Sequence, residues 1–207
     1  MAIWQSTPEE AWKNHILPKA STNSRWINES KAISDTIGLN MRELFGLIIL
    51  AHLKNGNNTI WETGFDQAQG EPNDGYITDG HSTIRIEHKV IVEEAKQEVL
   101  DEILDTYQRF AAKGPSYGKD RVLVIQPNKP PDHGGLIKIS ELAKSIGNSC
   151  NFERVLTLSM VSRKGEGDRK GVFHLIQHFP SIKSGIAEVV FDFPTGTGEV
   201  THCQINI

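Results

Sequence analysis

Hydrophobic and polar positions repeat with two different periods along the chain, and these periods predict its elements. "NMRELFGLIILAHLK" (40–54) is apolar nearly all round at helical spacing, which is typical of a buried helix. "VIVEEAKQEVLDEILDTYQRFAAKG" (90–114) repeats apolar residues every three or four positions and carries acids on the opposite face. It predicts a long amphipathic helix that Gly114 and Pro115 end.

Three shorter patterns at the N-terminal side and in the second half predict further helices. "STPEEAWKNHI" (6–16) begins with Thr7 as a cap, Pro8 in the first turn and Glu10 completing a capping box. A second helix is expected over 25–37, and a short one over "KISELAKSIG" (138–147).

Strands are predicted where short runs alternate or are uniformly apolar. "RVLVIQ" (121–126), ended by Pro127, has the composition of a central strand that is buried on both faces. Asp79 and Gly80 form a turn signal between two strands, and the segment 65–74 is read as a polar loop. The other predicted strands are "TIWETG" (59–64), "GYIT" (75–78), "STIRIEHKV" (82–90), "NFERVLTLSMVSR" (151–163), "GVFHLIQHF" (171–179), "IAEVVFDF" (186–193) and "VTHCQINI" (200–207).

The order of these elements predicts an α/β fold with a mixed central sheet flanked by helices. A helix that joins two strands implies a crossover and some parallel pairing. We expect one domain over 1–207, with a core over about 40–126 and a β-rich C-terminal extension over 150–207.

Composition fits that picture and narrows the class of protein. The chain has 207 residues, of which 38% are hydrophobic and 23% charged, as in a soluble globular protein. The formal net charge of -4 argues against indiscriminate nucleic-acid binding by bulk charge. With two distant cysteines, no signal-like N-terminus and no apolar stretch of membrane length, we expect a cytoplasmic protein without a membrane span.

The strand 82–90 carries the candidate chemistry. Its alternation places Glu87 and Lys89 on one face and Ile84, Ile86 and His88 on the other. An exposed ion pair would account for Glu87 and Lys89. Asp74 stands before the hairpin, and Asp79 is a rival acid that already has a role in the turn.

An acid before a hairpin, followed by Glu-x-Lys on its second strand, resembles the PD-(D/E)xK nuclease superfamily. The matching residues are Pro72-Asn73-Asp74 and Glu87-His88-Lys89, with Asn73 interrupting the literal Pro-Asp pair. The element order over 40–126 matches the order of that family's core. The family's first helix often carries one more acid, and Glu43 stands at the corresponding place here, although Asn40 and Glu43 also make a capping box.

The resemblance implies a Mg²⁺-dependent deoxyribonuclease, with Mn²⁺ able to substitute. Phosphodiester hydrolysis needs an activated water and charge neutralisation, which a hard cation held by carboxylates supplies. Asp74, Glu87 and the main-chain carbonyl of His88 are the expected ligands, and Lys89 is expected to orient the water. Glu62 is a rival to Glu43 as an accessory acid.

The function expected is that of a type II restriction endonuclease, a homodimer that cuts duplex DNA. A junction-resolving or repair nuclease with the same core, and an inactive nucleic-acid-binding scaffold, are the alternatives. Basic loops are candidates for DNA contact, each of which an ordinary polar loop would also explain. One, "SRKGEGDRKG", holds Arg163, Lys164, Arg169 and Lys170, and the other, "KGPSYGKDR", holds Lys113, Lys119 and Arg121 beside Tyr117.

Other chemistries find no support in the motifs. No GxxxxGK[ST], no GxGxxG after a strand and no GxSxG is present, so P-loop, Rossmann and serine-hydrolase readings fail. His81 and His88 do not have the spacing of a zinc site and have no cysteine nearby.

Overall fold

The computed structural model describes nine segments of the chain, namely residues 2–20, 41–55, 59–66, 75–91, 99–127, 144–146, 150–165, 169–180 and 185–205. The expected helix over 25–37 and most of the one over 138–147 lie outside these residues, and so does Asp74.

A nine-stranded mixed sheet dominates the fold, with its strands in sequence order. The β4–β5 and β5–β6 pairs are parallel, and the other neighbouring strands are antiparallel. The strands are β1 (Ala2–Ser6), β2 (Glu62–Asp66), β3 (Gly75–Thr78), β4 (Thr83–Val90), β5 (Arg121–Gln126), β6 (Arg154–Lys164), β7 (Lys170–Phe179), β8 (Ile186–Asp192) and β9 (Thr197–Cys203).

Among the described residues helices are few beside this sheet, so the mixed α/β class is confirmed with a larger share of strand than expected. The helical elements are α1 (Pro8–Ala11), the π-helical turn η1 (Trp12–Ile16), α2 (Leu17–Ala20), α3 (Met41–Lys54), α4 (Val99–Ala111) and α5 (Pro115–Gly118). Among the described residues, none of these helices is long and apolar enough to span a bilayer.

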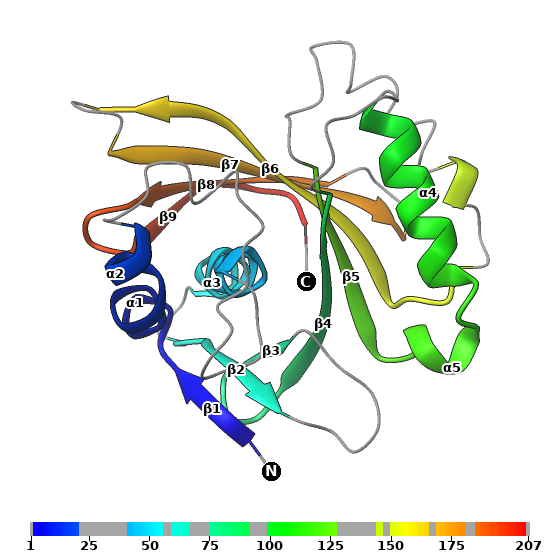
Figure 1. Cartoon of the computed structure of the whole chain (residues 1–207), viewed down its shortest axis with the longest axis horizontal. Coiled ribbons are helices and arrows are strands. Elements are labelled where there is room, and N and C mark those ends of the chain that lie inside the picture. The colour runs from blue at the N-terminus through cyan, green and yellow to red at the C-terminus, as the bar shows by residue number, and fades with distance from the viewer. Residues whose placement is uncertain are drawn as a thin grey trace.

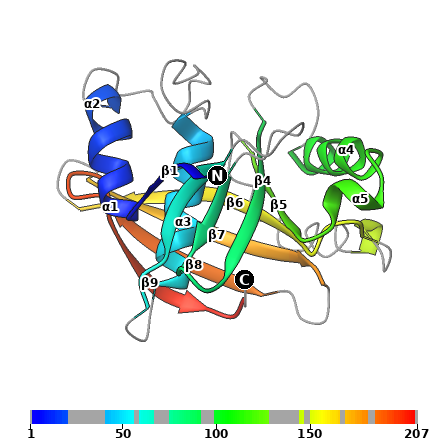
Figure 2. The ribbon, with the colours of Figure 1, turned by 90° about the horizontal axis from the view of Figure 1, so that it is seen from below.

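The sheet curves around α3, and α4 and α5 lie on its other side beside β5 (Figure 1). Seen from below, α1 and α2 stand at the opposite end of the sheet from α4 and α5 (Figure 2). The apolar sequence of α3 explains its central place. Every residue from Leu44 to Leu53 is buried, and His52 is the ionisable side chain among them. His52 satisfies its ring by hydrogen bonding with the Gly196 carbonyl at 3.1 Å between Nε2 and O.

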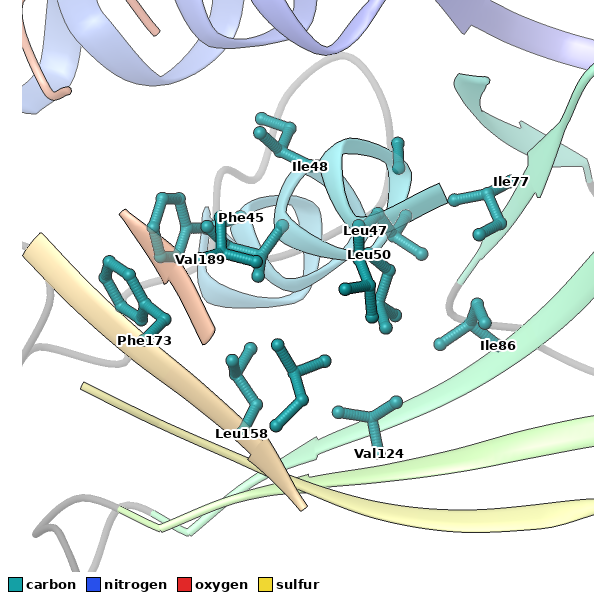
Figure 3. Close-up of a cluster of buried hydrophobic side chains, with 14 of the residues drawn as sticks. Phe45, Leu47, Ile48, Leu50, Ile77, Ile86, Val124, Leu158, Phe173 and Val189 are labelled. Atoms are coloured by element: carbon teal, nitrogen blue, oxygen red, sulfur yellow. The ribbon is translucent and has the colours of Figure 1, made fainter. Parts of the chain in front are cut away.

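The main core forms where α3 meets the concave side of the sheet. Phe45 packs edge-on against Phe173 and Phe191, with ring centroids 5.1 and 5.2 Å away. Figure 3 shows the α3 side chains pointing at residues of the strands from β3 to β8, among them Ile77, Ile86 and Val124. This core fixes which face of β4 looks inward.

A second, smaller core lies on the opposite side of β5. Leu123 and Ile125 of β5 pack there with Ile103 and Tyr107 of α4. Consequently β5 is buried on both faces, as its uniformly apolar sequence predicts.

Candidate active site

The hairpin of β3 and β4 forms as the sequence predicts. The Asp79 carboxylate accepts hydrogen bonds from the backbone N–H groups of His81 and Ser82, at 2.9 and 2.7 Å. Gly80 has a φ of +84°, which the turn requires and glycine adopts freely. Asp79 is therefore engaged in the turn, as expected for the rival acid.

The period of the strand sends the candidate residues to opposite faces of β4. Ile86 joins the main core, and the His88 ring lies on the same side, with Nδ1 3.4 Å from the main-chain carbonyl oxygen of Glu43. Glu87 is paired with Leu123 and Lys89 with Ile125, both of which belong to the second core. Glu87 and Lys89 therefore share the face that looks toward α4 and α5.

Glu43 lies on the side of β4 opposite to Glu87, so this position does not favour a direct contact between the two acids. Its backbone touches His88, on the α3 side of β4. Glu62 lies on the same face of the sheet as Glu87. It pairs with Thr78, and Thr78 pairs with Thr83. Thr83 and Glu87 are an even number of residues apart on β4, so their side chains point to the same face. Of the two accessory acids, Glu62 is the one on the face of Glu87, where it accepts a hydrogen bond from the Gln5 side chain.

Asp74 lies outside the described residues. The chain is described from Gly75 onward, and Gly75 pairs with Ile86, the residue that precedes Glu87. Gly75 itself has no room for a side chain, since a Cβ there would lie 2.4 Å from Leu47 Cδ1 and 2.9 Å from the Gly64 carbonyl oxygen.

Glu87 is a buried acid surrounded by basic groups. Its residue exposure is 5%, and Oε2 lies 3.8 Å from Arg121 Nη1. Burial raises the pKa of the Glu87 carboxyl above its ordinary value. A hydrogen bond from Tyr117 lowers that pKa, as do the charges of three neighbours, in decreasing order Lys113, Arg121 and Lys89. Lys89 is exposed.

The sequence did not associate Arg121, Tyr117 and Lys113 with Glu87, although it marked their loop as basic. The connection depends on the parallel register of β4 and β5, which sets Arg85 beside Arg121 and Glu87 beside Leu123. The signal available in the sequence was the position of Arg121 at the very start of a strand that follows a crossover helix.

The donor chemistry at Glu87 fits one ligand of a hard divalent cation. The carboxylate is buried, and within the described part of the chain its Oε2 atom accepts no hydrogen bond. A buried oxygen of this kind gains from coordinating a cation. No group of three His, Cys, Asp or Glu side chains converges among the described residues, which do not include Asp74.

The basic hairpin tip of β6 and β7 lies away from Glu87. Register places Val155 of β6 level with Leu123, and Arg163 is eight residues further on, about 26 Å at the rise of a strand. Arg163 and Lys164 are exposed, Lys170 pairs with Lys164, and Arg169 Nη2 lies 3.4 Å from the Asp192 carboxylate. Lys119 is exposed two residues before β5.

The chain matches no protein-family model, no curated protein and no solved structure. The site therefore has to be interpreted from its own geometry.

Proposed function

We propose that this protein is a metal-dependent endonuclease that hydrolyses phosphodiester bonds of duplex DNA. The observation that carries the proposal is the common face of Glu87 and Lys89 on β4, a strand paired antiparallel with β3 and parallel with β5. Apart from the short α5 that stands between α4 and β5, the elements α3, β2, β3, β4, α4 and β5 have the order that the resemblance to PD-(D/E)xK nucleases implies.

Asp74, Glu87 and the main-chain carbonyl of His88 are the proposed metal ligands. Glu87 contributes a buried carboxylate whose Oε2 atom is available as a ligand. Asp74 precedes Gly75 directly in the sequence, and Gly75 is paired with the neighbour of Glu87. A bound Mg²⁺ or Mn²⁺ supplies charge neutralisation of the phosphate and lowers the pKa of a water.

Lys89 has the role of orienting that water and stabilising charge on the phosphate. Its side chain is exposed on the face of Glu87, where the ammonium group can donate to a water or to a phosphate oxygen. In the proposed reaction the water oxygen forms the new bond to phosphorus. The bond from phosphorus to the leaving sugar oxygen breaks, and that oxygen takes up a proton.

A type II restriction endonuclease is the specific class that we favour, acting as a two-fold dimer. The C-terminal strands support it, because β6 to β9 extend the sheet well beyond the proposed core and present a basic hairpin tip. A junction-resolving or repair nuclease with the same core would cut branched DNA in preference to linear duplex.

A binding scaffold without catalysis is the second candidate, and one contact favours it. The ion pair of Glu87 with Arg121 neutralises the acid without a metal ion. Under this alternative the protein binds nucleic acid, and Glu87 serves only to hold Arg121.

Cleavage of plasmid and of branched DNA, with Mg²⁺ or with EDTA, tests the proposal. We expect cleavage in Mg²⁺ alone, its loss in Asp74→Ala, Glu87→Gln and Lys89→Ala, and its retention in Lys13→Ala, an exposed lysine of η1. Circular dichroism and thermal melting establish that each variant is folded. No metal-dependent cleavage over a broad set of DNA sequences and structures would overturn the nuclease reading.

A further inference from the structure

The ring of Tyr117 holds two cations beside the proposed site. Lys113 Nζ donates a hydrogen bond to the Tyr117 hydroxyl at 2.9 Å and lies 4.1 Å from the ring centroid. Arg121 Cζ lies 4.6 Å from the same centroid. Cation–π contacts of this geometry fix the two side chains in place.

A third cation stands next to this pair. Arg85 is the register partner of Arg121 across the parallel β4–β5 pair, so the two arginines project side by side. Like charges placed opposite one another in a sheet are destabilising. Glu87 is one acid beside them, and its carboxylate lies against Arg121.

Cationic side chains gather around Glu87. Lys113, Arg121 and Lys89 are the charges that lower its pKa, and Arg85 is the register partner of Arg121. A cluster of fixed cations of this kind can form an anion site.

The face also offers room for a large ligand. A hollow of about 580 Å³ opens along the β3–β4 hairpin, and Arg85, Tyr76 and Asp120 are among its lining residues. Arg85 and Lys113 are exposed, so their charged ends are accessible from solvent. Arg85 lines this hollow and is also the register partner of Arg121, so the hollow adjoins the cluster of cations.

We propose that Arg85 and Lys113 form a phosphate clamp that contacts backbone phosphates of duplex DNA beside Glu87, with the buried Arg121 as the register partner of Arg85. Guanidinium and ammonium groups bind phosphate strongly and without regard to sequence. Only the assignment of DNA as the ligand rests on the proposed function. Tyr117 positions Lys113 and Arg121 and is a positioning residue.

Fluorescence anisotropy with a labelled mixed-sequence DNA duplex in EDTA, measured over a series of salt concentrations, tests the clamp. Each phosphate contact contributes about 0.9 to the slope of log affinity against log salt concentration. Arg85→Ala and Lys113→Ala should each weaken binding and reduce that slope by about 0.9, and the double variant by about 1.8. Lys13→Ala is the matched control and should keep the wild-type slope.

Two further variants keep the result interpretable. Tyr117→Phe removes the hydroxyl that accepts from Lys113, and should weaken binding less than Lys113→Ala because the ring remains. Arg121→Lys retains the charge at a buried position and avoids an unpaired Glu87. If Arg85→Ala and Lys113→Ala bind DNA with the wild-type affinity and slope, the clamp is wrong.

The clamp and the nuclease fail in different ways. Clamp-dependent DNA binding without cleavage in Mg²⁺ would overturn the proposed function and leave the clamp standing. Glu87-dependent cleavage with unchanged binding in Lys113→Ala would overturn the clamp and leave the nuclease standing. A wild-type protein that binds RNA or an acidic protein but not duplex DNA would overturn the clamp as stated.

Discussion

The carboxylate of Glu87 and the guanidinium of Arg121 lie 3.8 Å apart, and their side chains are only 6% and 9% exposed. Both charges are thus held away from water, which is costly unless each is compensated. Burial nevertheless dominates at Glu87 and raises its pKa in spite of Arg121. The fold therefore buries the Glu87 carboxyl at an energetic cost. Ionisable groups at functional sites often have pKa values that are shifted in this way.

This cost predicts how Glu87→Gln changes stability with pH. A carboxyl whose pKa is raised by folding makes the protein less stable as the pH rises from the ordinary glutamate pKa through the raised value. Glutamine is neutral throughout, so the variant should be more stable than the wild type at neutral pH. The two free energies of unfolding should converge in acid, where Glu87 is protonated.

Urea unfolding of both proteins from about pH 3.5 to 8 measures the difference between their free energies of unfolding. This range spans the ordinary glutamate pKa of about 4.3 and values above it. A difference that stays constant with pH, or that grows toward acid, would contradict the raised pKa.

Lys89→Ala should reduce cleavage by about 100-fold or more, the usual effect of losing a group that assists proton transfer or charge stabilisation. Its side chain is exposed, so the fold should tolerate the change. Single-turnover rates at saturating Mg²⁺ measure the effect, with Lys13→Ala as the control. A rate within a factor of a few of the wild type would remove Lys89 from the mechanism.

Phe45→Ala should lower the free energy of unfolding by about 3–5 kcal/mol. The ring is buried and contacts four aromatic side chains, so its loss leaves a cavity between α3 and the sheet. Ile60→Ala is the control, because Ile60 is 65% exposed and should change stability little. Similar losses in the two variants would show that α3 is not packed as described.

Gly46→Ala should destabilise the protein by about 1–3 kcal/mol, the usual range for overpacking. A Cβ at this position would lie 2.4 Å from Cε1 and 2.7 Å from Nδ1 of the buried His88 ring. His88→Ala removes the ring that causes the clash, so the double variant should be more stable than the sum of the two single effects predicts. Strictly additive effects in chemical denaturation would show that the two residues do not touch.

The sequence predicted those elements whose signals are local. The capping box of Thr7 and Glu10 forms with both hydrogen bonds, at 3.3 Å each. The uniformly apolar runs became α3 and β5, and the period of two on β4 correctly separated His88 from Glu87. In each case the residues within one element determine the outcome.

Elements that depend on a distant partner were predicted less well. β1 (Ala2–Ser6) has no alternating pattern and forms because β2 offers an edge with which to pair. β2 starts at Glu62 and extends to Asp66, so Phe65 and Asp66 belong to a strand and not to the polar loop. The contact of Glu87 with Arg121 joins residues that only the β4–β5 register brings together.

Anomalous diffraction from crystals grown with Mn²⁺ tests the central claim most directly. The account predicts a manganese ion bound by the carboxylates of Glu87 and Asp74 together, with the His88 carbonyl as a further ligand. It also predicts that the ion is absent in crystals of Asp74→Ala. Crystals in which Glu87 stays paired with Arg121, with no manganese at its carboxylate, would contradict the claim that this hairpin is a metal-dependent nuclease site.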